Sequence, residues 1–207
     1  MFKDRNDAGF LLAQKLSAYK NKKDTLVLAI PRGGVVVAYE VAKQLNLPLD
    51  VIVIKKIGFP GNEELALGAA GLDSYYINEE LAHSVSQEYV KEQVKIKQQE
   101  VKKRYESLRG KKHMYDAKNK TIIIIDDGIA TGATMTMAAE IIKKQSPKKI
   151  IIAIPVAAPE SITKLKRIAE VICLSQPEFF MAISQFYEQF AQLKDEEAKQ
   201  LLEEANK

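Results

Sequence analysis

The chain has 207 residues, of which 46% are hydrophobic and 28% are charged. This composition is typical of a folded domain with a sizeable core and excludes a disordered chain. The net charge is +4, but residues 91–112 hold nine Lys or Arg against three Glu, an excess of +6 that leaves −2 for the rest of the chain. Because the basic residues are confined to one polar segment, a solvated helix face explains them better than a nucleic-acid partner does.

No apolar run approaches the roughly 18 residues that a membrane span needs. The amino terminus, MFKDRNDAGF, lacks the charged-then-apolar layout of a signal peptide. We therefore expect a cytoplasmic protein with no membrane partner. The single cysteine, Cys173, excludes an internal disulfide, and its apolar neighbours predict a buried structural thiol.

Two strand-loop-helix units are predicted in the first quarter of the chain, after an amphipathic opening helix. The first strand runs into the sequence PRGG, so two glycines stand at its carboxyl end. The second strand is another β-branched apolar run and ends at a pair of lysines. The expected elements are a helix over 5–19, a strand over 25–30, a helix over 35–45 and a strand over 49–54.

Residues 55–72 are expected to form a flexible loop, because the hydrophobic period is lost and four glycines, a proline and an asparagine lie within 57–72. Loops of this length in compact domains are usually functional or disordered. The lysines at its base, Lys55 and Lys56, favour a lid over a tolerated insertion.

Residues 79–109 are predicted to form a long helical arm, preceded by a short strand over 74–77. Apolar residues recur at near-helical intervals, and neither glycine nor proline occurs before Gly110. A narrow apolar stripe on so polar a segment indicates either a projecting arm or a dimer contact, so a homodimer is one expected assembly.

The second half of the chain again alternates strands with helices. Further strands are expected over 121–125, 149–154 and 170–174, and helices over 133–144 and 159–168. This alternation predicts a single α/β domain over residues 1–207, with a mostly parallel sheet flanked by helices. The aromatic residues of 175–193 follow no clear period and form a candidate hood, and a last helix begins at Asp195.

Common nucleotide-binding patterns are absent. The chain has no G-x-x-x-x-G-K-[ST] sequence, and no G-x-G-x-x-G opens a helix. The two histidines, His83 and His113, are expected at the surface, and a single cysteine cannot build a zinc cluster. The chemistry must therefore come from other residues.

The stretch TIIIIDDGIATGATM, residues 121–135, carries the strongest chemical signal. A β-branched strand ends in Asp126 and Asp127, and a loop of small and hydroxylated residues then opens a helix. Ligands of parallel sheets bind beyond the carboxyl ends of the strands, and a helix amino terminus binds anions. Successive side chains of an extended chain point in opposite directions, so the two acids suit sugar hydroxyls or hydrated Mg²⁺ better than a proton-transfer dyad.

These residues resemble the phosphoribosyl diphosphate (PRPP) motif of type I phosphoribosyltransferases, with its apolar strand, acidic pair and Thr-Gly loop in register. The sequence AIPRGG resembles the family's diphosphate-binding loop, and the segment after Lys55 lies where the family has its flexible loop. The resemblance covers most of residues 1–193 and is greatest to a group of uncharacterised predicted phosphoribosyltransferases.

The resemblance implies transfer of ribose 5-phosphate from Mg²⁺-bound PRPP to a small nitrogenous acceptor, with release of diphosphate. Asp126 and Asp127 would contact the ribose hydroxyls and lie near the metal. The residues implied for the 5-phosphate are Gly128, Ile129, Ala130, Thr131, Gly132, Ala133 and Thr134. Those implied for the diphosphate are Arg32, Gly33 and Gly34, with Lys55 and Lys56 as further cations.

The acceptor is not identified by these motifs. Hypoxanthine-guanine enzymes of the family carry an aspartate where this chain has Ala130, whereas adenine enzymes carry alanine there. Hoods that recognise the acceptor usually come from chain ends, and a role in the hydrophobic core is the alternative for the aromatic candidates. The candidates are Val156, Ala157, Phe179, Phe180 and Tyr187.

Two other functions remain as alternatives. A regulator that senses PRPP or binds RNA could keep the same fold without catalysis and use the basic arm as its contact surface. A phosphohydrolase with paired aspartates is disfavoured, because Asp127 is followed by Gly-Ile-Ala-Thr-Gly, a phosphate loop that lacks the spacing of a nucleophile and an acid.

Overall fold

A computed structural model describes residues 1–110 and 115–207. The described residues form a five-stranded parallel sheet in the order β2-β1-β6-β7-β8 and a three-stranded antiparallel sheet in the order β3-β4-β5. The strands of the parallel sheet are β1 (Thr25–Ala29), β2 (Leu49–Val51), β6 (Thr121–Ile125), β7 (Lys149–Val156) and β8 (Glu170–Ser175). The predicted α/β fold with a parallel sheet flanked by helices is confirmed.

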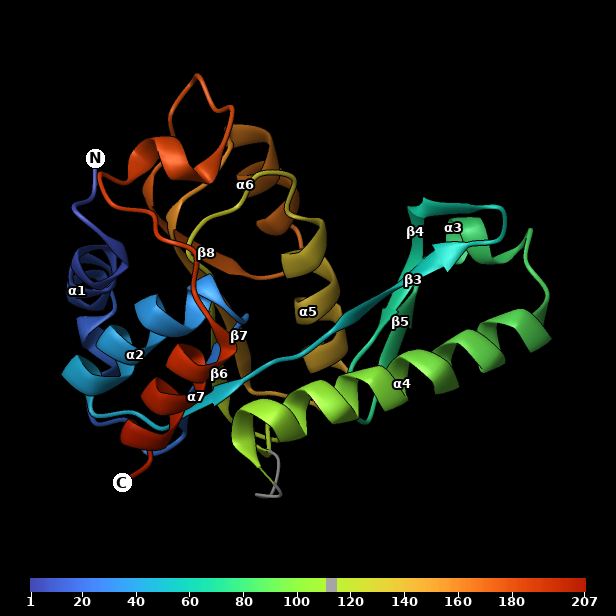
Figure 1. The fold of residues 1–207 in the computed structure, drawn as a ribbon, viewed down its shortest axis with the longest axis horizontal. Helices are drawn as coiled ribbons and strands as arrows, with labels where there is room; N and C mark the ends of the chain where they lie inside the picture. The colour runs from blue at the N-terminus through green and yellow to red at the C-terminus, as the bar shows by residue number, and fades with distance from the viewer. Residues whose placement is uncertain (111–114) are drawn as a thin grey trace.

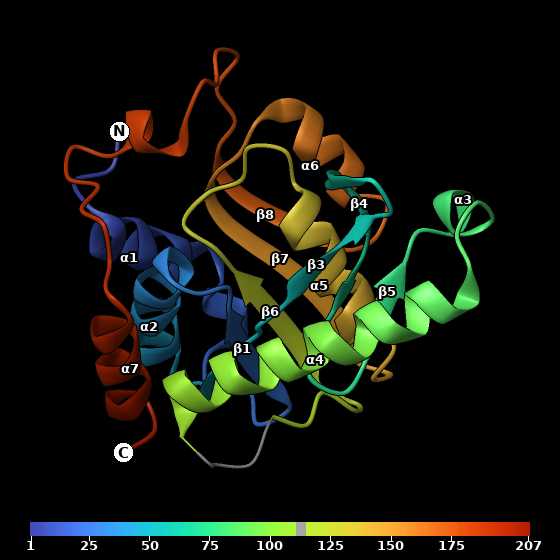
Figure 2. The same cartoon turned by 45° about the vertical axis from the view of Figure 1, so that its right-hand side comes forward.

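Helices cover both faces of the parallel sheet, as Figures 1 and 2 show. Side chains on one face pack with α1 (Arg5–Lys15), α2 (Gly33–Leu45) and α7 (Asp195–Glu204). Those on the other face pack with α5 (Ala133–Lys143) and α6 (Pro159–Leu165). Successive isoleucines of β6 alternate between these two clusters, which explains why the whole strand is apolar.

The strand order reverses between β1 and β6, which lie side by side at the centre of the sheet. Ala29 pairs with Ile125, and the amide of Ile30 donates to the carbonyl of Ile125 at 2.9 Å. The two strands therefore end level with each other. A crevice at such a reversal is where ligands of open α/β sheets bind.

Residues 55–72, expected to be an irregular loop, mostly form a hairpin of β3 (Lys55–Phe59) and β4 (Asn62–Ala70), next to β5 (Tyr75–Ile77). Phe59 pairs with Asn62 across Pro60 and Gly61, and Gly61 has a φ of +77°. A Pro-Gly pair at a two-residue turn is the signal that explains this difference.

The predicted arm over 79–109 is two helices, α3 (Glu79–Ala82) and α4 (Gln87–Arg109). The interruption arises because Ser86 caps α4, its Oγ accepting the amide of Tyr89 at 3.2 Å. The apolar stripe of α4 is used within the chain. Val94 packs with the hairpin, and Val101, Tyr105 and Leu108 enter the main core, so the stripe needs no dimer contact to explain it.

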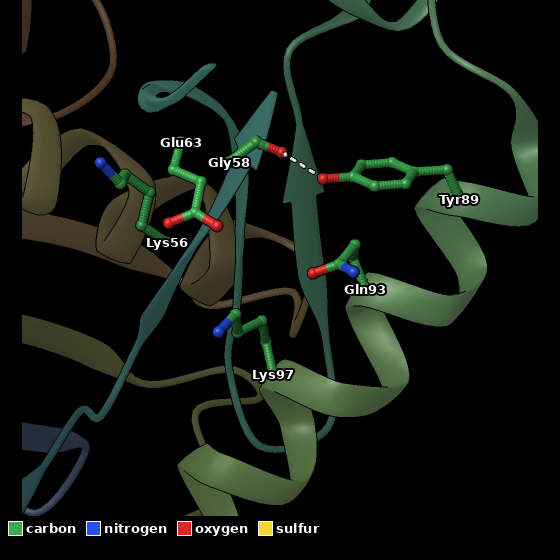
Figure 3. Close-up of a pocket in the computed structure, with 6 residues that line it drawn as sticks. All are labelled: Lys56, Gly58, Glu63, Tyr89, Gln93 and Lys97. Atoms are coloured by element: carbon green, nitrogen blue, oxygen red, sulfur yellow. Dashed lines mark hydrogen bonds between the residues drawn. The ribbon is translucent and has the colours of Figure 1, made fainter. Parts of the chain in front are cut away.

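The amino-terminal half of α4 lies along the hairpin, where the hydroxyl of Tyr89 donates to the carbonyl of Gly58 at 3.1 Å. A pocket of about 190 Å³ lies between these elements and is drawn in Figure 3. The candidate hood, 175–193, is irregular apart from a short 3-10 helix over Ile183–Phe186, and a second one covers Ser17–Tyr19. His83 is exposed, His113 lies outside the described residues, and none of the described helices has the length and hydrophobicity to span a membrane.

The carboxyl-terminal half of α4 is tied to the parallel sheet through a buried carboxylate. Asp50 of β2 forms an ion pair with Arg109 at 3.0 Å and accepts the Tyr105 hydroxyl at 3.0 Å. Burial raises the pKa of Asp50, and the neighbouring Arg109 partly opposes this effect. The ionised form of Asp50 therefore depends on these two residues of α4.

We expect Arg109→Met to lower the free energy of unfolding by about 3–5 kcal/mol, because it leaves the buried Asp50 carboxylate without its cation. Chemical denaturation measures this loss. The double variant Asp50→Asn with Arg109→Met should recover part of it, and Lys103→Met, at an exposed position of the same helix, should change stability by less than about 0.5 kcal/mol. If Arg109→Met lowered the free energy of unfolding by as little as Lys103→Met does, the assigned role of Arg109 as the cation of the buried Asp50 would be contradicted.

Candidate active site

The loops after β1 and β6 pack closely against each other at Gly33 and Gly34. A Cβ atom on Gly33 would lie 1.9 Å from Oδ2 of Asp127, and one on Gly34 would lie 2.8 Å from the carbonyl oxygen of Ile125. Only glycine fits at these two positions. The helices α2 and α5 begin at Gly33 and Ala133. Their amino termini therefore both lie beyond the carboxyl ends of β1 and β6, an arrangement that favours anions.

Asp126 is the half-buried acid of the pair, and its Oδ1 accepts the amide of Asp127 at 2.8 Å. Its pKa is raised well above the usual value, first because burial disfavours the charged form and second because the Asp127 carboxylate repels it. A ligand that brings hydroxyl donors or a cation would stabilise the ionised form.

Asp127 is buried, and its carboxylate is already paired. Arg5, at the start of α1, lies 2.7 Å from Oδ2 of Asp127 and also donates to the carbonyl of Ala191 at 2.9 Å. The Arg5 guanidinium stands 3.8 Å from the ring centroid of Phe190. The carboxylate of Asp127 is therefore compensated within the protein, and Asp126 is the acid more open to a ligand.

Hydrogen bonds to β7 and α6 hold one side of the loop over 128–134, and four of its residues are exposed. Ile129 exchanges backbone hydrogen bonds with the end of β7, and Ser161 of α6 donates to the carbonyl of Ala130 at 2.6 Å. Gly132 has a φ of +77°, in the left-handed region that favours glycine. The exposed members of the loop are Ala130, Thr131, Ala133 and Thr134.

A pocket of about 210 Å³ lies in front of the carboxyl ends of β1 and β2. The pocket extends from the loop after β1 to the start of α5, since Pro31 and Thr134 both line it. Lys55 reaches it, whereas Lys56 lines the separate pocket between the hairpin and α4 (Figure 3). The remaining lining residues are Ile30, Ile52, Val53, Ile54 and Arg104.

Arg32, between β1 and α2, is the cation of the PRGG loop. Its side chain is 44% exposed and lies 3.8 Å from Asp195 at the start of α7. Lys55 is 46% exposed and lies 3.9 Å from Glu100 of α4. These distances leave both cations able to turn toward an anionic ligand.

The candidate acceptor residues have different environments. Val156, Phe180 and Tyr187 belong to one apolar cluster with Phe2, whereas Phe179 is 88% exposed. The hydroxyl of Tyr187 donates to the carbonyl of Asp127 at 2.6 Å, so this residue supports the acidic pair. Ala157 is buried directly after β7 and pairs with Ile129 in an isolated bridge.

The acids suit a metal only together with a substrate. Among residues 1–110 and 115–207, no group of three His, Cys, Asp or Glu side chains could hold a metal ion. Mg²⁺ is commonly held by one or two carboxylates together with substrate phosphates. Asp126 fits this pattern, whereas the Asp127 carboxylate is bound to Arg5.

The cysteine lies outside this chemistry. Cys173 is half-buried in β8, where its thiol donates to the carbonyl of Ser175 at 3.0 Å. Burial raises the pKa of the thiol to about 11, so the reactive thiolate is disfavoured.

Comparison with known proteins agrees with this architecture. The family model of the phosphoribosyl transferase domain matches residues 5–191, and the chain belongs to this family. A crystal structure of TT1426 from Thermus thermophilus is similar to this chain with a TM-score of 0.88 and 37% identity, over 98% of each chain. The AQ2163 protein of Aquifex aeolicus, with a TM-score of 0.50 and 18% identity over 82% of this chain and 73% of its own, shares the fold.

Two relatives come from Mycobacterium tuberculosis, strains CDC 1551 / Oshkosh and ATCC 25618 / H37Rv. Each is 36% identical to this chain over 211 residues, and each is named as a proposed phosphoribosyl transferase. The match covers 100% of this chain but 47% of either relative, so the chain spans about half the length of the curated relatives it matches.

Because the folded protein holds the Asp126 proton more tightly than the unfolded chain does, ionisation of Asp126 costs folding free energy. This cost appears as the pH rises above the unfolded value of about 3.9 and is complete above the folded pKa. We expect Asp126→Asn to be more stable than the wild type at pH 7, and the difference to vanish as the pH falls below about 4.

Denaturant titrations at several pH values measure this difference. Asp24→Asn is the matched control, since the hydrogen bond from Lys148 lowers the pKa of Asp24, and its replacement should not stabilise the protein at pH 7. A loss of stability in Asp126→Asn at pH 7 would contradict the assigned environment.

Proposed function

We propose that the protein is a phosphoribosyltransferase that binds Mg²⁺-PRPP and transfers ribose 5-phosphate to a nitrogenous, nucleobase-like acceptor, with release of diphosphate. The observation that carries the proposal is the contact of the glycine loop after β1 with the acidic end of β6. A ligand that occupies both loops needs one group for each helix amino terminus and hydroxyls between them, and PRPP has this arrangement of groups.

In the proposed complex the 5-phosphate lies on the loop over 128–134, at the amino terminus of α5. Asp126 accepts hydrogen bonds from the ribose hydroxyls. The diphosphate lies at the amino terminus of α2, near Arg32 and Lys55. A bound Mg²⁺ supplies charge neutralisation to the departing diphosphate, and Asp126 is the residue that would hold it.

The chain promotes the transfer by stabilising the charge that separates in the transition state. The bond from the anomeric carbon to the diphosphate breaks as the acceptor nitrogen approaches, so the ribose becomes positively charged and the leaving group becomes more negative. Fixed amides and cations at the leaving group stabilise this state without reorganisation. In this complex the ionised Asp126 lies beside the ribose, and its negative charge stabilises the positive charge that develops on the sugar.

The test is diphosphate release from Mg²⁺-PRPP in the presence of each member of a panel of nucleobases and related amines. At least one acceptor should give release, and Asp126→Asn should lower both release and PRPP affinity by about tenfold or more, the value of a lost charge-assisted hydrogen bond or two. Lys103→Gln, at an exposed position of α4, should behave as the wild type.

PRPP binding without release for any acceptor would favour the alternative, a non-catalytic PRPP sensor on the same fold. Calorimetry without a binding signal for Mg²⁺-PRPP would contradict both functions. RNA binding through the basic residues of α4 would appear as a mobility shift that Lys103→Gln weakens in proportion to the charge lost.

We further propose that the exposed tip of the β3-β4 hairpin, residues 58–65, covers the bound ligand and excludes water. The hairpin base is fixed because Ile57 and Leu67 are fully buried, whereas Glu63 and Glu64 at the tip are exposed. Shortening the tip should lower turnover several-fold with little change in PRPP affinity. Equal turnover would contradict this role.

A further inference from the structure

Arg104 brings a cation from outside the two loops into the proposed site. It lies on α4 and lines the same pocket as Pro31, Lys55 and Thr134. Its side chain is 27% exposed. The pocket thus receives residues from the ends of β1 and β2, from the start of α5 and from α4.

The position of Arg104 is fixed by its neighbours on α4. Tyr105 and Arg109 contact the buried Asp50 of β2, and Val101 is fully buried in the main core. The helix therefore cannot rotate to remove Arg104 from the pocket without breaking these contacts. The guanidinium can change partners while its helix stays in place.

The present partner of Arg104 is Asp195, the first residue of α7. Both terminal nitrogens of the guanidinium donate to this carboxylate, and the Nη2 contact is 2.6 Å. Asp195 also lies 3.8 Å from Arg32 of the PRGG loop. The hydrogen bond from Arg104 lowers the pKa of Asp195, so the carboxylate is ionised at neutral pH.

One exposed carboxylate is therefore shared by two arginines, Arg32 of the PRGG loop and Arg104, which lines the pocket. The side chain of Asp195 is 41% exposed, so water can reach the carboxylate and weakens the ion pair. The apolar residues of α7, Ala198 and Leu202, are already buried against the core, which fixes that helix without the ion pair. The pair is thus easily exchanged for a stronger anion.

On the basis of the proposed function, we propose that Arg104 is a further residue that binds the diphosphate group of PRPP, and that Asp195 holds Arg104 and Arg32 until the diphosphate displaces its carboxylate. A diphosphate offers more acceptor oxygens and more negative charge than one carboxylate. The planar guanidinium can bind it through two parallel hydrogen bonds. Asp195 then acts as a built-in competitor of the leaving group.

Replacing Arg104 should weaken ligand binding, whereas replacing Asp195 should not, and this difference separates ligand binding from a structural role. Calorimetry should show that Arg104→Gln weakens Mg²⁺-PRPP and Mg²⁺-diphosphate by about tenfold or more, and Arg104→Lys should recover part of this loss. Asp195→Asn, which releases both arginines, should bind these ligands as tightly as the wild type or up to about fivefold more tightly. Lys103→Gln, the neighbouring exposed position, is the charge-matched control.

Ribose 5-phosphate, which lacks the diphosphate, provides the second readout. Its affinity should be the same in Arg104→Gln and the wild type, and thermal unfolding checks that each variant is folded. Equal weakening by Arg104→Gln and Asp195→Asn would show a structural pair and overturn the inference, as would an unchanged PRPP affinity in Arg104→Gln. A wild type that does not bind Mg²⁺-PRPP would contradict the proposed function itself, and the inference with it.

Discussion

The contact between the PRGG loop and the acidic end of β6 is the constraint on which the rest of the site depends. Gly33 lies against the carboxylate of Asp127, and Gly34 lies against the backbone of Ile125, so a methyl group at either position would collide with its neighbour. The parallel pairing of β1 with β6 sets this contact, because both strands end at the same level. The amino termini of α2 and α5 then lie at the same end of the parallel strands, an arrangement that favours anions.

This close approach places two adjacent carboxylates, Asp126 and Asp127, in a partly buried site, and the protein compensates their negative charges to different extents. Arg5 compensates Asp127 from the opposite end of the sequence, and Tyr187 binds the carbonyl of the same residue. Within residues 1–110 and 115–207, the hydrogen bond to the carboxylate of Asp126 comes from the amide of Asp127, and burial and the Asp127 charge raise the pKa of Asp126 despite the nearby Arg5. In the proposed complex, a cation or hydroxyl donors would stabilise the ionised carboxylate of Asp126 and offset this cost.

The local parts of the site could be predicted from sequence, and the long-range parts could not. The strand over 121–125 was predictable because a β-branched run is buried on both faces, and the acids and glycines follow it directly in the chain. The ion pair of Arg5 with Asp127 joins residues 122 positions apart, and nothing near Arg5 marks it as a site residue. The hairpin over 55–70 does not follow from the hydrophobic period, which is lost in this segment, and Pro60 and Gly61 are the local signal of its turn.

The most direct test of the proposed function is a crystal structure of the protein with Mg²⁺-PRPP. We expect the 5-phosphate on the amides of the loop over 128–134, the ribose hydroxyls at Asp126, and the diphosphate at Arg32 with the Arg5–Asp127 ion pair retained. PRPP bound elsewhere on the chain, or bound with its diphosphate on the loop over 128–134, would contradict it.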